Sequence, residues 1–164
     1  MFEGKGRHDS VRAWVAGCAT GEEAYSIAML LYEHRAKLSN PPKVQVLASD
    51  IDEMAIGVAR SGRYPALLVK DIPPERLAHF FTSADGSYQV RKEVRELCTF
   101  SMHSIIRDPP FSRIDLISCR NLLIYLDSEL QNRVIPAFHY SLVPSGHLLL
   151  GSSEMVSRHM NCSR

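Results

Sequence analysis

Two adjacent carboxylates follow a glycine-containing turn near the start of the chain. Residues 11–16 are apolar, and Glu22 and Glu23 open a helical pattern. Between them, Gly17 and Gly21 would permit close approach of a ligand to the backbone. In an α/β fold this turn lies at the carboxyl end of the first strand, where ligands bind. A pyrophosphate needs bare amides or a cation at a helix start, and these two acids would repel it. The site suits a ligand with hydroxyl groups or positive charge, which indicates S-adenosylmethionine rather than NAD or ATP.

A third carboxylate, Asp50, ends the next apolar segment, residues 43–49. A carboxylate at the tip of the second strand can accept both hydroxyl groups of a ribose. The alternative is that it caps the following helix. Asp52 is better placed for the cap, which leaves Asp50 for the ribose. We expect Ile51, between the two acids, to contact the adenosine.

An arginine and an asparagine follow a further apolar segment, residues 114–119. Arg120 and Asn121 stand where a parallel sheet presents its functional groups. They can bind the carboxylate of the methionine moiety, or position a substrate, through charge-assisted hydrogen bonds. The alternative is structural, with Asn121 bonding only to nearby backbone. We favour the functional role.

These side chains need a parallel sheet to bring them to one edge, and the order of segments predicts one. Residues 20–23 (T-G-E-E) match a capping box that opens a helix of roughly 17 residues. A second helix spans residues 52–61 and ends at Gly62. Two successive strand–helix units imply right-handed crossovers and a parallel sheet. The apolar stripe of the first helix consists of Ala24, Ile27, Ala28 and Leu31.

Later segments continue the pattern. Residues 98–102 and 114–119 read as the third and fourth core strands. Asp127 opens a long helix that Pro136 should kink, and a P-S-G turn leads to a last strand at 148–150. The predicted fold class is α/β, a three-layer α/β/α Rossmann-like arrangement around a mostly parallel sheet.

Residues 63–97 interrupt this rhythm. A short helix starts at Pro73 and Pro74, and S-A-D-G-S at 83–87 between two apolar segments predicts a hairpin. We interpret 63–97 as a small inserted hairpin subdomain, and the part around Phe80–Arg95 as a candidate surface for docking a partner. The catalytic core would then span 11–164, after a disordered lead-in at 1–10.

Composition narrows the class of protein. The length of 164 residues suits one domain with a real core, and a net charge of +1 gives no general attraction to nucleic acid. The four cysteines form no C-x-x-C pair and lack histidines at metal-ligand spacing, so we expect no metal, no disulfides and a cytoplasmic location. Since no apolar run approaches the roughly 20 residues of a membrane span, we expect no membrane insertion.

Three segments, taken in order, resemble the CheR-type chemotaxis receptor methyltransferases. They read G-C-A-T-G-E-E-A-Y-S at 17–26, A-S-D-I-D at 48–52 and D-L-I-S-C-R-N-L-L-I-Y-L-D at 115–127. A P-S-G-H-L-L-L-G-S-S-E ending at 144–154 fits as well. The versions most similar are those embedded in multidomain signalling proteins. Family members carry a helical domain before the first strand, so the resemblance implies the C-terminal S-adenosylmethionine-binding domain in a chain that looks truncated.

The resemblance implies methyl transfer from S-adenosylmethionine to glutamate side chains of chemoreceptor cytoplasmic domains, with S-adenosylhomocysteine as product. Methylesterase or sensory domains would be further partners. It also implies that His103 and Ser104, after the third strand, meet the adenine. The alternative for His103 is a surface loop position without a ligand contact. Tyr125 resembles the family tyrosine near the transferred methyl, and Arg120 joins it as a catalytic residue. A half-buried packing role is the alternative for Tyr125.

The chemistry of such a transfer needs little from the protein. A sulfonium is a good leaving group and a carboxylate is already a nucleophile at neutral pH. Catalysis would rest on in-line positioning and desolvation, without a strong general base. A catalytically incomplete module that only binds the cofactor is the alternative function. A dinucleotide oxidoreductase is disfavoured, because the first turn has acids and lacks G-x-G-x-x-G.

Overall fold

A five-stranded sheet with the order β6-β2-β1-β7-β8 forms the centre of the computed structural model, which describes residues 1–152 and 154. All four strand pairs in this sheet are parallel. The chain runs outward from β1 through β2 to β6, then returns to the other side of β1 with β7 and β8. The switch point therefore lies between β1 and β7, where α/β folds bind ligands. The strands are β1 (Ser10–Ala16), β2 (Lys43–Asp50), β6 (Cys98–Met102), β7 (Ile114–Cys119) and β8 (Leu142–Leu150).

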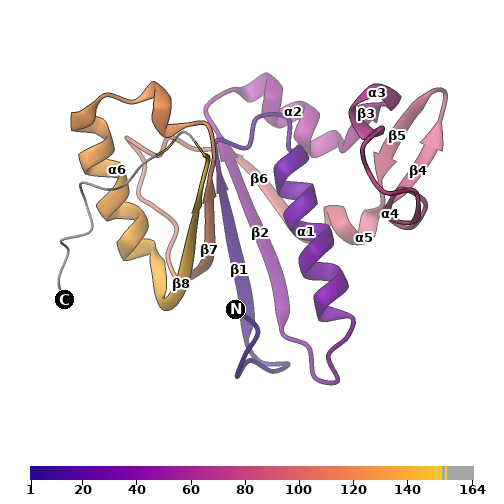
Figure 1. Ribbon diagram of the computed structural model, residues 1–164, viewed down its shortest axis with the longest axis horizontal. Helices are drawn as coiled ribbons and strands as arrows, with labels where there is room; N and C mark the ends of the chain where they lie inside the picture. Colours follow the sequence, from indigo (N-terminus) through magenta and orange to yellow (C-terminus); the bar gives the residue numbers. More distant parts are fainter. Residues whose placement is uncertain (153, 155–164) are drawn as a thin grey trace.

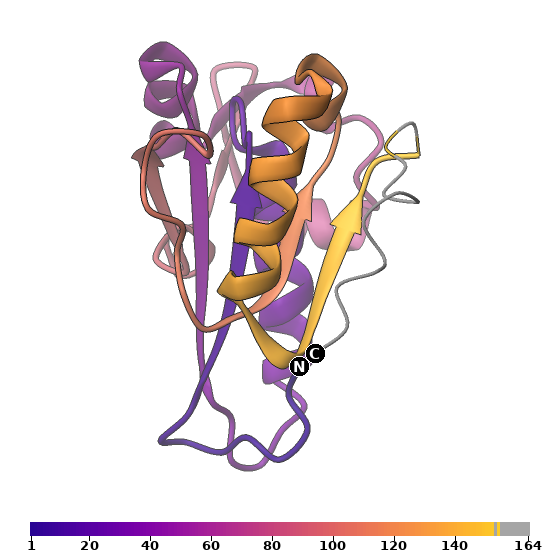
Figure 2. The ribbon, with the colours of Figure 1, turned by 90° about the vertical axis from the view of Figure 1, so that its left-hand side faces the viewer.

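Helices cover both faces of this sheet. Figure 1 shows α1 (Glu22–Arg35) and α2 (Glu53–Ser61) on one face and α6 (Ser128–Ser141) on the other. Figure 2 shows α6 lying in front of the sheet. Alternate residues of β1 enter the two cores, with Val15 under α1 and Trp14 under α6. The predicted three-layer α/β/α fold is confirmed. None of the described helices is long and apolar enough to cross a membrane.

Several predicted elements have the bounds that the sequence indicated. β6 and β7 span 98–102 and 114–119, as expected. Asp52 caps α2, because its carboxylate accepts the backbone N–H groups of Met54 and Ala55. Gly62 ends α2 in the left-handed conformation, with φ 58°. Local hydrogen-bonding chemistry accounts for these matches.

The start of α1 differs from the prediction. Gly21, with φ 93°, is the N-cap residue and provides no side-chain cap. The hydroxyl of Thr20 donates to the carboxylate of Glu22 instead of accepting a backbone N–H. The predicted capping box is therefore wrong, and α1 has 14 residues. The cause is the left-handed turn at Gly21, which puts this glycine rather than Thr20 at the N-cap.

The last helix and strand also refine the prediction. Asp127 caps α6 by accepting the N–H of Leu130 at 2.9 Å, and α6 contains Pro136. β8 begins at Leu142 rather than at 148. The predicted P-S-G turn is an irregularity within this strand, since the pairing with β7 shifts register between Ile114 and Leu116. A bulge keeps both flanks of the segment on the same sheet edge.

A second sheet, with the order β3-β5-β4, lies between α2 and β6 in the sequence and beyond α1 in space (Figure 1). The predicted hairpin is confirmed as β4 and β5, with Asp85 and Gly86 both at positive φ. β3 was not predicted, because three residues carry no periodic signal. The elements are β3 (Arg63–Pro65), α3 (Ala66–Val69), α4 (Pro74–Phe80), β4 (Phe81–Ala84), β5 (Ser87–Val90) and α5 (Lys92–Arg95).

The segment before β1 is not the disordered lead-in that the sequence suggested. Lys5 Nζ lies 2.6 Å from Asp115 Oδ1, and Asp115 is 2% exposed. The ring of Phe2 packs against that of His34 at a tilt of 44°, with centroids 4.6 Å apart. A buried carboxylate requires a partner, and Lys5 supplies it. This long-range pairing has no signal in the local sequence.

Candidate cofactor site

The turn between β1 and α1 is fixed by its contacts with β2 and neighbouring side chains. Gly17 has φ 71° and Gly21 has φ 93°, a region that favours glycine. A Cβ on Gly17 would lie 2.9 Å from Leu122 Cδ2, and one on Gly21 would lie 2.8 Å from Ala59 Cβ. The sequence prediction assigned both glycines to close approach of a ligand. The structure shows that backbone conformation and protein packing require them.

Asp50 holds this turn with its carboxylate. Its Oδ2 accepts the backbone N–H of Ala19 at 2.8 Å, and its Oδ1 accepts that of Asp52 at 3.0 Å. Asp52 takes the cap of α2 as predicted, while the Asp50 carboxylate already accepts these two backbone N–H groups. Each carboxylate oxygen can accept more than one hydrogen bond, so ribose hydroxyl groups can still bind there. Ile51 is 73% exposed beside it and offers an apolar surface.

Glu23 faces the end of β7. Ser118 Oγ donates to Glu23 Oε1, and an Arg120 guanidinium nitrogen lies 3.8 Å from Glu23 Oε2. The fold thus brings together two predicted site residues that are 97 positions apart (120 − 23). Sequence reasoning missed Ser118, which is buried at the end of an apolar strand. A hydroxyl among aliphatic neighbours was the available signal.

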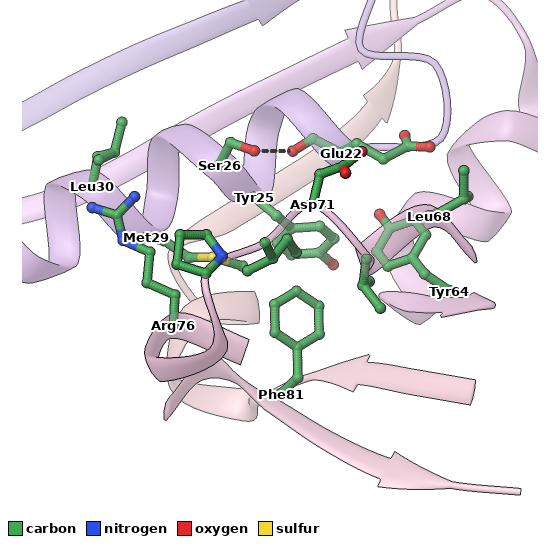
Figure 3. Close-up of a pocket in the computed structure, with 13 residues that line it drawn as sticks. Glu22, Tyr25, Ser26, Met29, Leu30, Tyr64, Leu68, Asp71, Arg76 and Phe81 are labelled. Carbon is green, nitrogen blue, oxygen red and sulfur yellow. Dashed lines mark hydrogen bonds between the residues drawn. The ribbon is translucent and has the colours of Figure 1, made fainter. Parts of the chain in front are cut away.

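Glu22 points elsewhere. It lines an apolar hollow of about 260 Å³ between α1 and the inserted subdomain, shown in Figure 3. Tyr25 and Phe81 form part of this hollow. Tyr64, from the insertion, donates its hydroxyl to the backbone carbonyl of Thr20 at 2.7 Å. The insertion therefore supports the glycine turn, whereas Glu22 is not joined to the Glu23–Arg120 pair.

The loop after β6 uses its polar groups internally. His103 Nε2 lies 3.0 Å from the carbonyl oxygen of Pro109, and the ring stacks on Phe111 with centroids 4.7 Å apart. The Ser104 hydroxyl accepts backbone N–H groups within the same loop. These two side chains have protein partners, while the backbone N–H of His103 donates to the carbonyl oxygen of Asp50 at 3.0 Å. The start of this loop therefore lies at the predicted edge, and contact of His103 and Ser104 with the adenine stays a prediction.

Met102 shows a different departure. It pairs with Asp50 across β2 and β6 and is 54% exposed, whereas a methionine in an apolar strand segment is expected in the core. The last residue of a strand leaves the helical layers, and its side chain meets solvent. Met102 therefore adds apolar surface beside the ribose-binding candidate.

The loop after β7 carries the remaining predicted residues. Asn121 has φ 57°, which is uncommon for a residue with a side chain. Tyr125 ends the short 3₁₀ helix η1 (Leu123–Tyr125) and is 79% exposed, so the half-buried packing role does not hold. Glu154 binds the backbone of this loop and was not predicted. The only signal in the sequence was that Glu154 belongs to the G-S-S-E ending that resembles the family.

The electrostatic character of this edge follows from its acids. Burial, together with Asp50, Glu22 and Glu23, raises the pKa of Cys18 to about 12. Burial, Glu154 and Glu23 likewise raise the pKa of Cys119 to about 12. Burial is the largest cause of both shifts, and the carboxylates beside the two cysteines raise the pKa further, so acids line the carboxyl ends of these central strands. This lining fits hydroxyl groups and a cationic sulfur.

This chain shares its doubly wound, mostly parallel sheet with solved structures of S-adenosylmethionine-dependent methyltransferases. Two of these solved structures illustrate the similarity to this chain. The glycopeptide N-methyltransferase MtfA has a TM-score of 0.56 and 14% identity, over 85% of this chain and 45% of that one. PKMT2 from Rickettsia typhi, in complex with AdoHcy, has a TM-score of 0.54 and 16% identity. The match covers 85% of this chain and 20% of that one.

The chain belongs to the CheR methyltransferase family, whose SAM binding domain it matches over residues 2–163. "Putative methyltransferase Cher3" of Pseudomonas putida is 37% identical over 155 residues, 90% of this chain and 55% of that protein. "Chemotaxis protein methyltransferase 2" of Vibrio cholerae is 37% identical over 152 residues, 90% and 52%. The chain thus spans about half the length of these relatives. It spans 15% of an uncharacterized 104.1 kDa protein of Rhodobacter capsulatus, to which it is 41% identical.

This membership confirms the predicted resemblance and the predicted cofactor, S-adenosylmethionine. The residues at the sheet edge fit that molecule. Asp50 offers acceptors for hydroxyl groups, Ile51 offers apolar surface, and Glu23 offers a negative charge. The fit to the cofactor rests on the chemistry of these three side chains and not on the two glycines.

Proposed function

We propose that this chain is the catalytic core of a protein-glutamate O-methyltransferase that modifies chemoreceptor cytoplasmic domains. One observation carries the proposal: Glu23 and Arg120 meet at the switch point, 3.8 Å apart, one strand away from Asp50. The 37% identity to a Vibrio cholerae protein named chemotaxis protein methyltransferase 2 supports the substrate class.

The site residues divide the cofactor among them. Asp50 binds the ribose hydroxyl groups, and Ile51 contacts the adenosine. Glu23 holds the positively charged amino group of the methionine moiety, with Ser118 fixing its carboxylate. Arg120 and Asn121 bind the carboxylate of that moiety. The Glu23–Arg120 contact lets the two charges neutralise each other when the site is empty and places them for an amino acid zwitterion.

The reaction asks the protein mainly for positioning. When bound, S-adenosylmethionine supplies a methyl group on a sulfonium, so the acceptor carboxylate needs no activation by a base. Tyr125 extends an exposed hydroxyl from the same loop as Arg120 and orients the acceptor glutamate. Held in line with the methyl group, that carboxylate reacts at a rate set by proximity and loss of water.

Two measurements test this function. Calorimetric titration should show binding of S-adenosylhomocysteine and none of NAD or ATP at the same site. Incubation with tritiated S-adenosylmethionine and a chemoreceptor cytoplasmic fragment should label the fragment, and mild base should release the label as volatile methanol, as expected of a methyl ester. Binding without transfer, even after a relative's helical domain is added, would favour the alternative of a cofactor-binding signalling module.

The proposed substrate sets the expected surroundings. A protein that methylates receptor cytoplasmic domains works in the cytoplasm, where methylesterase or sensory domains are further candidate partners. Nucleic acid is not among the expected partners, because the net charge is +1.

A further inference from the structure

The loop that carries Arg120, Asn121 and Tyr125 contains little regular structure of its own. η1 spans three residues, and a 3₁₀ turn of this length has few internal hydrogen bonds. Asn121, at its start, adopts the left-handed conformation with φ 57°. Such a conformation persists where the surroundings hold it. Leu123 anchors this loop in the core, and its polar contacts come from the segment after β8, distant in sequence, and from the start of the adjacent helix α6.

Glu154 holds the amino end of the turn. Its Oε1 accepts the backbone N–H groups of Leu122 at 2.9 Å and Leu123 at 2.8 Å. Its Oε2 accepts the N–H of Gly151, just after β8, at 2.6 Å. A Cβ on Gly151 would lie 3.2 Å from Asn121 N, so this backbone packs directly against Asn121. Glu154 therefore joins the end of β8 to the start of η1.

Gln131 holds the carboxyl end of the same turn. Its Nε2 donates to the carbonyl oxygens of Leu123 at 2.9 Å and Leu126 at 3.1 Å. Gln131 belongs to the first turn of α6, which packs on the sheet. An acceptor thus stands at the N–H end of η1 and a donor at its carbonyl end, which is the polarity that a helical turn requires.

We infer that Glu154 and Gln131 form a clamp of positioning residues that fixes the loop from Arg120 to Tyr125 for cofactor binding. The inference rests on the proposed cofactor contacts of Arg120 and Asn121. Because both ends of η1 are held, the turn keeps a single position, and the Arg120 guanidinium remains beside the Glu23 carboxylate. Without the clamp, the loop loses the polar contacts that define its path. Cofactor binding must then order the loop, which lowers the affinity.

Substitutions at both ends test the clamp. Glu154→Ala removes three acceptor contacts, whereas Glu154→Gln keeps one oxygen for Leu122 and Leu123. Gln131→Met keeps the length of the side chain and removes both donors. Asn132→Ala, at the next and exposed position of α6, is the matched control. The affinity for S-adenosylhomocysteine is measured by calorimetry at a temperature where circular dichroism shows each variant fully folded.

We expect about tenfold weaker binding for Glu154→Ala, a partial recovery for Glu154→Gln, and weakening of about threefold or more for Gln131→Met. Asn132→Ala should stay within about twofold of the parent. A purely structural role would lower the melting temperature and leave the affinity of the folded protein unchanged. If Glu154→Ala does not fold, the affinity of Gln131→Met for S-adenosylhomocysteine alone decides whether the clamp positions the loop.

Direct variants separate this inference from the proposed site. If Asn121→Ala and Arg120→Ala weaken binding while the clamp variants bind normally, the positioning role is overturned and the site stands. If Asn121→Ala and Arg120→Ala leave affinity unchanged, the loop does not contact the cofactor and both proposals fall.

Discussion

The carboxylate of Asp50 accepts the backbone N–H of Ala19 at 2.8 Å, which ties the end of β2 to the turn that follows β1. Ala19 has φ 46°, so this bond holds a residue that is rarely found in the left-handed region. The same carboxylate is the proposed ribose acceptor. One side chain therefore shapes the site and binds in it.

Asp50→Ala should weaken binding of S-adenosylhomocysteine by about 1–3 kcal/mol, the scale of a lost hydrogen-bond partner in a partly buried site. Asp52→Ala is the matched control, because it removes the cap of α2. It should cost about 0.5–2 kcal/mol of stability and leave the affinity unchanged. Calorimetry below both unfolding transitions makes the comparison. Equal affinity of Asp50→Ala and the parent would remove Asp50 from the site.

Glu23→Gln should weaken binding of the same ligand by about 1.5–3 kcal/mol, the range for hydrogen bonds to charged groups. Glu22→Gln should change it much less. The structure places Glu23 at Arg120, whereas Glu22 lines the hollow toward the insertion. The sequence prediction assigned both acids to the cofactor, and this pair of variants separates them. A larger loss at Glu22 would contradict the geometry.

The sequence predicted the elements whose signals are local. β6 and β7 are short apolar segments between turn residues, and Asp52 and Gly62 mark the ends of α2 by capping chemistry. Because parallel strands end at one edge, the positions of Asp50 and Arg120 on that edge also followed from topology. The acids of the first turn indicated S-adenosylmethionine, and the resemblance to a family then pointed to the same cofactor.

Long-range contacts could not be predicted. Ser118 and Glu23 are 95 residues apart, and Glu154 lies 32 residues from Leu122. Their pairing depends on side-chain directions at strand ends, which periodicity does not encode. The error at Thr20 has the same origin, since the conformation of Gly21 decides which residue caps α1.

Cys18, Cys98 and Cys119 should react slowly with thiol reagents in the folded protein. Burial is the largest cause that raises each pKa from 9.0 to about 12. At pH 8 the thiolate fraction then falls by about a thousandfold relative to an ordinary thiol. Rates of reaction with Ellman's reagent, with and without urea, check this in a Cys162→Ser variant. Fast labelling of all three cysteines in the native protein would contradict the burial.

The same shifts give stability a pH dependence. A thiol whose pKa is higher in the folded state keeps its proton while the unfolded chain loses it. The free energy of unfolding should therefore fall as pH rises from 9.0 toward 12. Urea denaturation at pH 8 and pH 10 measures this slope. Because Cys18 and Cys119 both contribute, replacing either with alanine should make the fall in the free energy of unfolding between pH 8 and pH 10 smaller. A parent protein whose free energy of unfolding is the same at both pH values would contradict the raised pKa values.

Tyr125→Phe should lower kcat for methyl transfer to a receptor fragment by about tenfold or more, since it removes one hydrogen bond to a charged acceptor. Tyr125 is 79% exposed, so loss of its hydroxyl should leave the melting temperature unchanged. Affinity for S-adenosylhomocysteine should also be unchanged, because the hydroxyl orients the acceptor carboxylate and not the cofactor. Tyr140→Phe, at 83% exposure on α6, is the matched control and should retain full activity. A Tyr125→Phe variant with normal kcat would show that the acceptor is oriented by other groups, with Arg120 the next to test.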